Sequence, residues 1–89
     1  MPSYLIETYL ARGRAQERAA RERRARSAAE ELTQGSTRVH FDRSIHVPDD
    51  ETCFYVFDAP SARHAEDAAQ RAGLDPIRIV EAVTSGKEK

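Results

Sequence analysis

The chain has 89 residues, a formal net charge of −1 and a single cysteine, Cys53, which is the size of one small domain. One cysteine excludes an internal disulfide and a cysteine-based zinc site, and no apolar run is long enough to span a membrane. The segment Met1-Pro2-Ser3-Tyr4-Leu5 lacks the basic and long apolar regions of a signal peptide, so we expect a cytoplasmic protein.

The first part of the chain predicts a strand followed by a long helix. Residues 3–10 are rich in aromatic and β-branched residues, which favour a strand. Residues 14–32 consist mainly of Ala, Arg, Glu and Gln, which are strong helix formers. The alanines of this segment recur near every 3.6 residues and predict a narrow apolar stripe, and the helix should end at residues 34–36.

The middle of the chain predicts a hairpin. In residues 37–47 the apolar Val39, Phe41, Ile45 and Val47 are expected on one face, and His40, Asp42, Ser44 and His46 on the other. Pro48 and the acids after it favour a tight turn. Residues 52–58 are almost continuously apolar, which is typical of a central strand.

A second helix and a last strand complete the pattern. Ser61 is the expected N-cap of the helix, and Gly73 with Leu74 predicts its C-terminal turn. Residues 77–84 read as a strand, and residues 85–89 as a loose polar tail.

This order of elements predicts an α+β, ferredoxin-like βαββαβ domain spanning residues 1–84, with a four-stranded antiparallel sheet in the order 4-1-3-2. Both helices should then cover one face of the sheet. The strands carry apolar side chains on both faces, so the uncovered face would expose a large apolar patch. A homodimer that packs two such faces together, a dimeric α+β barrel with a central cavity, removes this exposure.

Nucleic-acid binding is not expected. Residues 12–26 carry seven arginines but also two glutamates, and this mixture is typical of a solvated helix face. The aromatic run 54–57 resembles the base-stacking strand of RNA-recognition domains, yet three acids, Asp49, Asp50 and Glu51, precede it and would repel phosphate.

The strand at residues 37–47 also contains the candidate metal ligands. His40 and Asp42 are two residues apart, a spacing that lets an imidazole and a carboxylate reach one divalent ion from one strand face. His46 is about 20 Å from His40 along an extended strand, so it would reach that ion only from a second subunit. Alternatively, Glu7 or Glu81 could supply a further carboxylate ligand from a neighbouring strand. A solvent-exposed polar face is the alternative interpretation.

Two carboxylates are candidates for catalysis. Glu7 and Glu81 each sit within an apolar strand segment, and the two strands are neighbours in the predicted sheet. A carboxylate that faces an apolar cavity would have a raised pKa and could act as a general acid or base. An ion pair with Arg43 or Arg78, or an outward position at the sheet edge, is the alternative. Tyr9 and Tyr55 could line such a cavity or belong to the core. We expect Cys53 to be a small buried residue and His64 to face solvent.

Several short segments resemble a bacterial family of small domains of unknown function, typified by a nickel-binding protein with a ferredoxin-like fold. They are Pro2-x-Tyr4-Leu5-Ile6-Glu7, Val39-His40-Phe41-Asp42-Arg43, Asp50-Glu51-Thr52-Cys53-Phe54, Asp58-Ala59-Pro60-Ser61, Arg71-Ala72-Gly73-Leu74 and Ile79-Val80-Glu81. The resemblance implies a homodimer and, for the typical member, bound nickel. That member is rich in histidine at the end of its first strand and in its last strand, where this chain has Glu7-Thr8-Tyr9 and Glu81-Ala82-Val83, so only His40 matches.

The sequence therefore predicts a homodimer that binds a divalent metal such as nickel, or a small ligand, in the cavity between the sheets. A cofactor-independent enzyme that uses Glu7 or Glu81 in the same cavity is the alternative. A pure interaction module is a third possibility.

Overall fold

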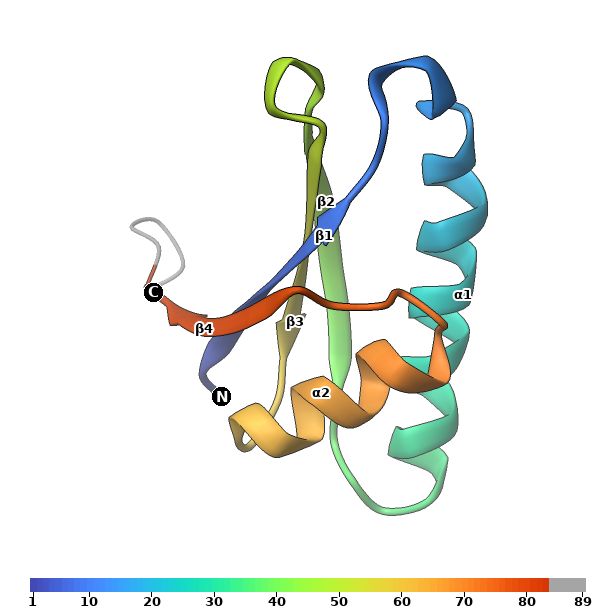
Figure 1. The fold of residues 1–89 in the computed structure, drawn as a ribbon. Helices are drawn as coiled ribbons and strands as arrows, with labels where there is room; N and C mark the ends of the chain where they lie inside the picture. Colours follow the sequence, from blue (N-terminus) through green and yellow to red (C-terminus); the bar gives the residue numbers. More distant parts are fainter. Residues whose placement is uncertain (84–89) are drawn as a thin grey trace.

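The computed structural model describes residues 1–83 and shows a four-stranded antiparallel sheet with two helices packed on one of its faces (Figure 1). The sheet order is β2-β3-β1-β4. The elements are β1 Ser3–Tyr9, α1 Glu17–Gln34, β2 His40–Val47, β3 Thr52–Asp58, α2 Ala62–Arg71 and β4 Arg78–Ala82, with short 3-10 turns at Arg12–Arg14 and Pro48–Asp50. The predicted α+β, ferredoxin-like fold and its strand order are confirmed.

The boundaries differ from the prediction mainly at the ends of the elements. Helix α1 begins at Glu17 instead of residue 14, because Arg12–Arg14 form a separate 3-10 turn. Strand β2 begins at His40 instead of residue 37, and β4 is confined to Arg78–Ala82. The predicted tail 85–89 and the predicted end of the domain at residue 84 lie outside the described residues. None of the helices in residues 1–83 is both long enough and apolar enough to cross a membrane.

The core lies between the sheet and the two helices. Side chains that alternate along the two central strands point into it: Tyr4 and Ile6 from β1, and Tyr55 and Phe57 from β3, are all at most 7% exposed. Phe41 of β2 packs against Phe57, with their ring centroids 5.4 Å apart. Small residues on the helices, such as Ala28 and Ala68, let both helices approach these aromatic side chains closely.

Only the C-terminal half of α1 follows the predicted alanine stripe. Ala25, Ala28, Ala29 and Leu32 are buried, as expected. Ala15, which precedes the helix, and Ala19, in its first turn, are exposed. The polar side chains of Arg18 and Glu22 contact the sheet there instead, through Ser44.

Helix α2 has the ends that the sequence predicts. The Ser61 hydroxyl accepts a hydrogen bond from the backbone N–H of His64, which caps the first turn. At the other end Gly73 has a φ of +69°. The N–H of Leu74 bonds to the carbonyl of Ala69, and the N–H of Gly73 to that of Gln70, at 3.0 Å each. These two bonds form the Schellman motif.

Strand β2 contains an irregularity that was not predicted, at the point where Arg43 interrupts the apolar pattern. Phe41 pairs with Phe57, but the next paired residue of β2, Arg43, lies opposite Val56, so the register skips Asp42. A one-residue insertion of this kind is a β-bulge, and it shifts the side chains that follow it to the opposite face. The predicted division of β2 into an apolar and a polar face is therefore wrong beyond Asp42.

Candidate functional site

The face of the sheet that the helices leave uncovered, here called the open face, has both apolar and polar side chains. Its apolar centre comes from all four strands, and its members are Leu5, Ile45, Val47, Phe54, Val56 and Val80. Its polar side chains lie around this centre; they are Ser3, Glu7, His40, Arg43, Asp58 and Arg78.

At one end of the open face, three polar side chains form a row across three strands. His40 of β2 lies opposite Asp58 of β3, which lies opposite Ser3 of β1. The Ser3 hydroxyl donates a hydrogen bond of 2.6 Å to the Asp58 carboxylate. His40 is exposed, so its imidazole is available to a ligand that approaches this face.

The three predicted metal ligands do not share a face. His40 belongs to the open face, but the bulge places His46 on the opposite face, directly across from buried Cys53. Asp42 lies at the bulge itself, and its carboxylate is 3.3 Å from the Arg43 guanidinium. Within residues 1–83, no three His, Cys, Asp or Glu side chains lie close enough to hold one metal ion.

The two predicted catalytic carboxylates also lie on opposite faces. Glu7 is in register with Arg78 of β4, whereas Glu81 is in register with Tyr4, whose side chain points into the core. The expectation that Glu7 and Glu81 form one cluster is therefore wrong, although their strands are neighbours as predicted. Glu7 is half-buried on the open face beside Arg78 and Phe54, and Glu81 is exposed at the sheet edge.

A polar cluster that the sequence analysis missed lies between the N-terminal half of α1 and the sheet. The Arg18 guanidinium donates to the Ser44 hydroxyl at 2.8 Å and to the Ser44 carbonyl at 3.1 Å, and the Ser44 hydroxyl in turn donates to Glu22. Ser44 is 6% exposed. Such a network is normal for a buried polar side chain. Only the bulge moves Ser44 to this face, and its one sequence signal is the charge of Arg43, which interrupts the apolar phase of residues 37–47.

Two polar atoms beside this cluster are buried without a hydrogen-bond partner among the described residues. They are the hydroxyl of Tyr55 and Nε2 of His46. Tyr55 lies opposite Ser44. Burial, together with the neighbouring Cys53 thiol, raises the pKa of Tyr55 well above its usual range, although Arg21 acts in the other direction. Tyr55 is thus a core residue and does not line the open face.

The remaining predicted residues have ordinary surroundings. Tyr9, at the end of β1, is 58% exposed, and its hydroxyl is 3.5 Å from the Glu51 carboxylate. Cys53 is fully buried, as expected. His64 is only partly buried, and its Nδ1 lies 2.9 Å from the Ser61 hydroxyl, within the cap of α2.

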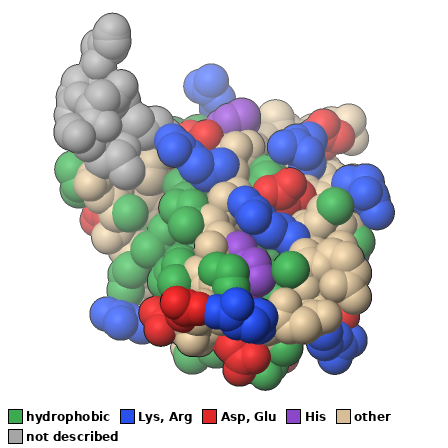
Figure 2. All heavy atoms as spheres, turned by 90° about the horizontal axis from the view of Figure 1, so that it is seen from above, with side chains coloured by type: hydrophobic (Ala, Val, Ile, Leu, Met, Phe, Trp, Pro, Cys, Tyr) green, Lys and Arg blue, Asp and Glu red, His purple; other side chains and the backbone are tan. Residues whose placement is uncertain are grey.

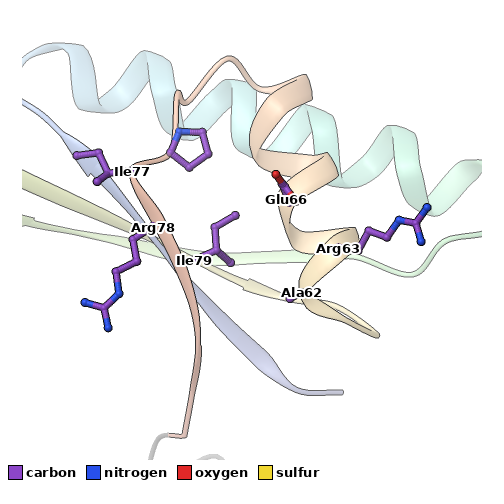
Figure 3. Close-up of a pocket in the computed structure, with 7 residues that line it drawn as sticks. Ala62, Arg63, Glu66, Ile77, Arg78 and Ile79 are labelled. Atoms are coloured by element: carbon purple, nitrogen blue, oxygen red, sulfur yellow. The ribbon is translucent and has the colours of Figure 1, made fainter.

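A cavity of about 740 Å³ lies between α2 and β4, but its charged side chains do not converge. Figure 3 shows that Arg78 extends from β4 away from α2, and that Arg63 extends from α2 away from the cavity. The apolar Ile77 and Ile79 line the strand side. This arrangement provides no group of side chains that would fix the orientation of a polar ligand.

The end of the molecule that points upward in Figure 1 shows no patch of a single charge. Blue basic and red acidic side chains alternate over this face, and green hydrophobic side chains gather to one side of it (Figure 2). A uniformly basic surface, which nucleic-acid binding needs, is not present on this face.

The fold defines a ferredoxin-like α+β protein with two helices on one face of its sheet. No family model matches the chain, and no curated protein matches it. The chain is similar in structure to SCO4226 from Streptomyces coelicolor A3(2), whose crystal structure matches with a TM-score of 0.69 and 22% sequence identity, over 93% of this chain and 98% of that one. At this identity, the likeness shows the fold alone.

Proposed function

We propose that the chain works as a cytoplasmic homodimer, joined through its open face, that binds a small ligand between the two sheets. The observation that carries this proposal is the uncovered apolar centre of the sheet, to which all four strands contribute. Ile45 on this face is 43% exposed. A second sheet would bury this centre, and the unpaired thiol of Cys53 suits a reducing compartment.

The charges of the open face support a second copy of the chain as the partner. A two-fold interface places one surface against itself, so the surface must be self-complementary. The open face carries two acids, Glu7 and Asp58, and two arginines, Arg43 and Arg78. Equal numbers of opposite charges around an apolar centre meet this requirement.

Glu7 and His40 are the polar groups best placed to contact a ligand in the enclosed space. If the ligand is a metal ion such as nickel, the ion would need ligands from both copies, because His46 lies on the other face of the sheet.

If the protein is an enzyme, Glu7 alone would act as the acid or base, since Glu81 is in register with core-facing Tyr4. If no ligand binds, the interaction module is the remaining function.

Light scattering over a dilution series tests the dimer. We expect a mass of about twice 10.0 kDa for the native chain, and the monomer mass for Ile45→Glu, because a charge on an apolar part of the interface opposes burial. Gln70→Glu, an exposed change on α2, is the matched control and should remain dimeric. A native chain that stays folded at the monomer mass, at every concentration, would contradict the proposal.

Substitutions on the open face test the ligand. Nickel titration followed by calorimetry should show weaker binding for His40→Ala than for the control His64→Ala; equal affinity would exclude His40 as a ligand. For organic ligands, Glu7→Gln should lose a ligand-dependent thermal shift that Glu81→Gln keeps. Loss of the shift in both variants would argue against a site on the open face.

A further inference from the structure

A second concave site lies on the helix side of the molecule, away from the open face. It is a groove of about 440 Å³ between α1 and the loop that joins α2 to β4, a volume within the range of small-molecule sites. We call it the α1 groove. Its lining residues are Tyr9, Glu17, Ala20, Arg21, Arg24, Gly73, Leu74, Asp75 and Ile77.

The spacing of residues on α1 explains one wall of the groove. Positions 20 and 21 each lie three or four residues from both 17 and 24, so the four positions share one face of the helix. The opposite wall is the segment Gly73-Leu74-Asp75, in which Gly73 and Asp75 have left-handed φ values of +69° and +57°. This bend brings Asp75 to the same groove as the helix face.

The charged side chains of the groove differ in how fully they are paired. Glu17 contacts both Arg14 and Arg21, and Arg21 also donates to the Tyr9 carbonyl at 3.2 Å. The charged groups of Glu17 and Arg21 therefore already have partners within the protein. Among the described residues, Arg24 bonds only through its Nε, which donates to the Ala72 carbonyl at 2.7 Å.

Arg24 and Asp75 therefore bring opposite charges to one groove without meeting. In residues 1–83, neither the terminal nitrogens of Arg24 nor the Asp75 carboxylate has a hydrogen-bond or ion-pair partner. A purely anionic ligand would be repelled by Asp75 and a purely cationic one by Arg24. A ligand that carries both charges would satisfy both residues.

The apolar part of the lining limits the ligand further. Ala20 and Leu74 line the groove, and Ile77 lies at it with 65% of its surface exposed. An apolar substituent on the ligand would cover Ile77 and remove apolar surface from water.

We infer that the α1 groove binds a free α-amino acid with an apolar side chain, with its carboxylate on Arg24, its ammonium group on Asp75 and its side chain against Ile77. The site does not depend on the proposed dimer, because every residue that lines it belongs to one chain and it lies away from the apolar centre of the open face. Loss of the dimer and loss of this site are therefore separate experimental outcomes.

Titration of the full chain with L-leucine, followed by NMR shifts of backbone amides, tests the inference. Saturable shifts confined to the groove are expected up to about 10 mM, a range that detects millimolar affinity. Leucinamide lacks the carboxylate, and N-acetyl-leucine lacks the ammonium group. Each should bind at least about tenfold more weakly, because a hydrogen bond between charged groups is lost.

Variants of the protein complete the test. Arg24→Gln and Asp75→Asn should each weaken L-leucine binding about tenfold, and Arg23→Gln, an exposed change on the same helix, should leave it unchanged. Asp75→Asn is the safer variant for folding, since asparagine adopts a left-handed φ readily. The inference is overturned by absence of binding, by equal binding of N-acetyl-leucine, or by unchanged affinity in folded Asp75→Asn.

Discussion

His46 lies directly opposite Cys53 across strands β2 and β3, on the face of the sheet that the helices cover. Cys53 is fully buried there, and Nε2 of His46 is buried without a hydrogen-bond partner among the described residues. A thiol beside an imidazole is the arrangement of a cysteine nucleophile and its base. In this protein, however, the helix layer shields the sulfur from solvent.

This burial predicts an unreactive thiol. Native protein treated with iodoacetamide should label Cys53 far more slowly than a free thiol, because the thiolate must be accessible to react. The same protein unfolded in guanidinium chloride should label fully, and mass spectrometry measures both. Rapid stoichiometric labelling of the native state would show instead that the sulfur is accessible and that His46 and Cys53 form a reactive pair.

The position of His46 also shows which part of the site could be predicted from the sequence. The fold was predictable, since helix-forming and strand-forming segments alternate clearly and Ser61 and Gly73 mark the ends of α2. The faces of β2 were predictable only up to Asp42. A bulge depends on the pairing with β3 as well as on the residues of β2, so strict alternation placed Ser44 and His46 on the wrong face.

The pairing of Glu7 and Glu81 failed for a related reason. Topology places β1 beside β4, but the register decides which residues share a face. A shift of the register by one residue moves each side chain of a strand to the opposite face of the sheet. Glu81 lies opposite Tyr4, and Glu7 opposite Arg78. Similarly, the α1 groove depends on the left-handed φ of Asp75, a conformation that aspartate can adopt but does not by itself predict.

The buried hydroxyl of Tyr55 makes the substitution Tyr55→Phe informative. Because this hydroxyl has no partner among residues 1–83, its removal should leave the free energy of unfolding unchanged or raise it by up to about 1 kcal/mol. Thr8→Val is the matched control, since the buried Thr8 hydroxyl donates a 2.8 Å hydrogen bond to the Cys53 carbonyl. That variant should be destabilised by about 1 kcal/mol.

Urea denaturation of the three proteins measures both changes. A loss of about 1 kcal/mol or more in Tyr55→Phe, comparable with that of Thr8→Val, would mean that the hydroxyl has a partner in solution.

The raised pKa of Tyr55 predicts a loss of stability at alkaline pH. The unfolded chain releases the phenolic proton near pH 10, whereas burial keeps the native hydroxyl protonated to higher pH. The unfolded state then binds fewer protons than the native state, so unfolding becomes more favourable as the pH rises above about 10. The effect of this one group approaches about 1.4 kcal/mol per pH unit.

Comparison with Tyr55→Phe isolates that group from the other titrating residues. The difference in unfolding free energy between the two proteins should be constant below about pH 9 and should grow in favour of the variant above about pH 10. Parallel stability curves up to about pH 11 would show that Tyr55 ionises equally easily in both states.

The two helices end in the same hydrogen-bond pattern, but only α2 has glycine at the left-handed position. In α1 that position is Ser36, with a φ of +84°. The N–H of Ser36 bonds to the Thr33 carbonyl at 3.1 Å, and the N–H of Thr37 to the Leu32 carbonyl at 2.9 Å. The preceding Gly35 has an ordinary φ of −88°.

Ser36→Gly should therefore stabilise the protein by about 0.5–1 kcal/mol, because a side chain strains the left-handed conformation. Gly73→Ala should destabilise it by about 1 kcal/mol for the same reason. Gly35→Ala is the control and should be nearly neutral, since an added Cβ would come no closer than 3.6 Å to its neighbours. Thermal unfolding of the three variants measures these shifts. A destabilised Ser36→Gly would mean that the serine side chain, and not the backbone conformation, holds the end of α1.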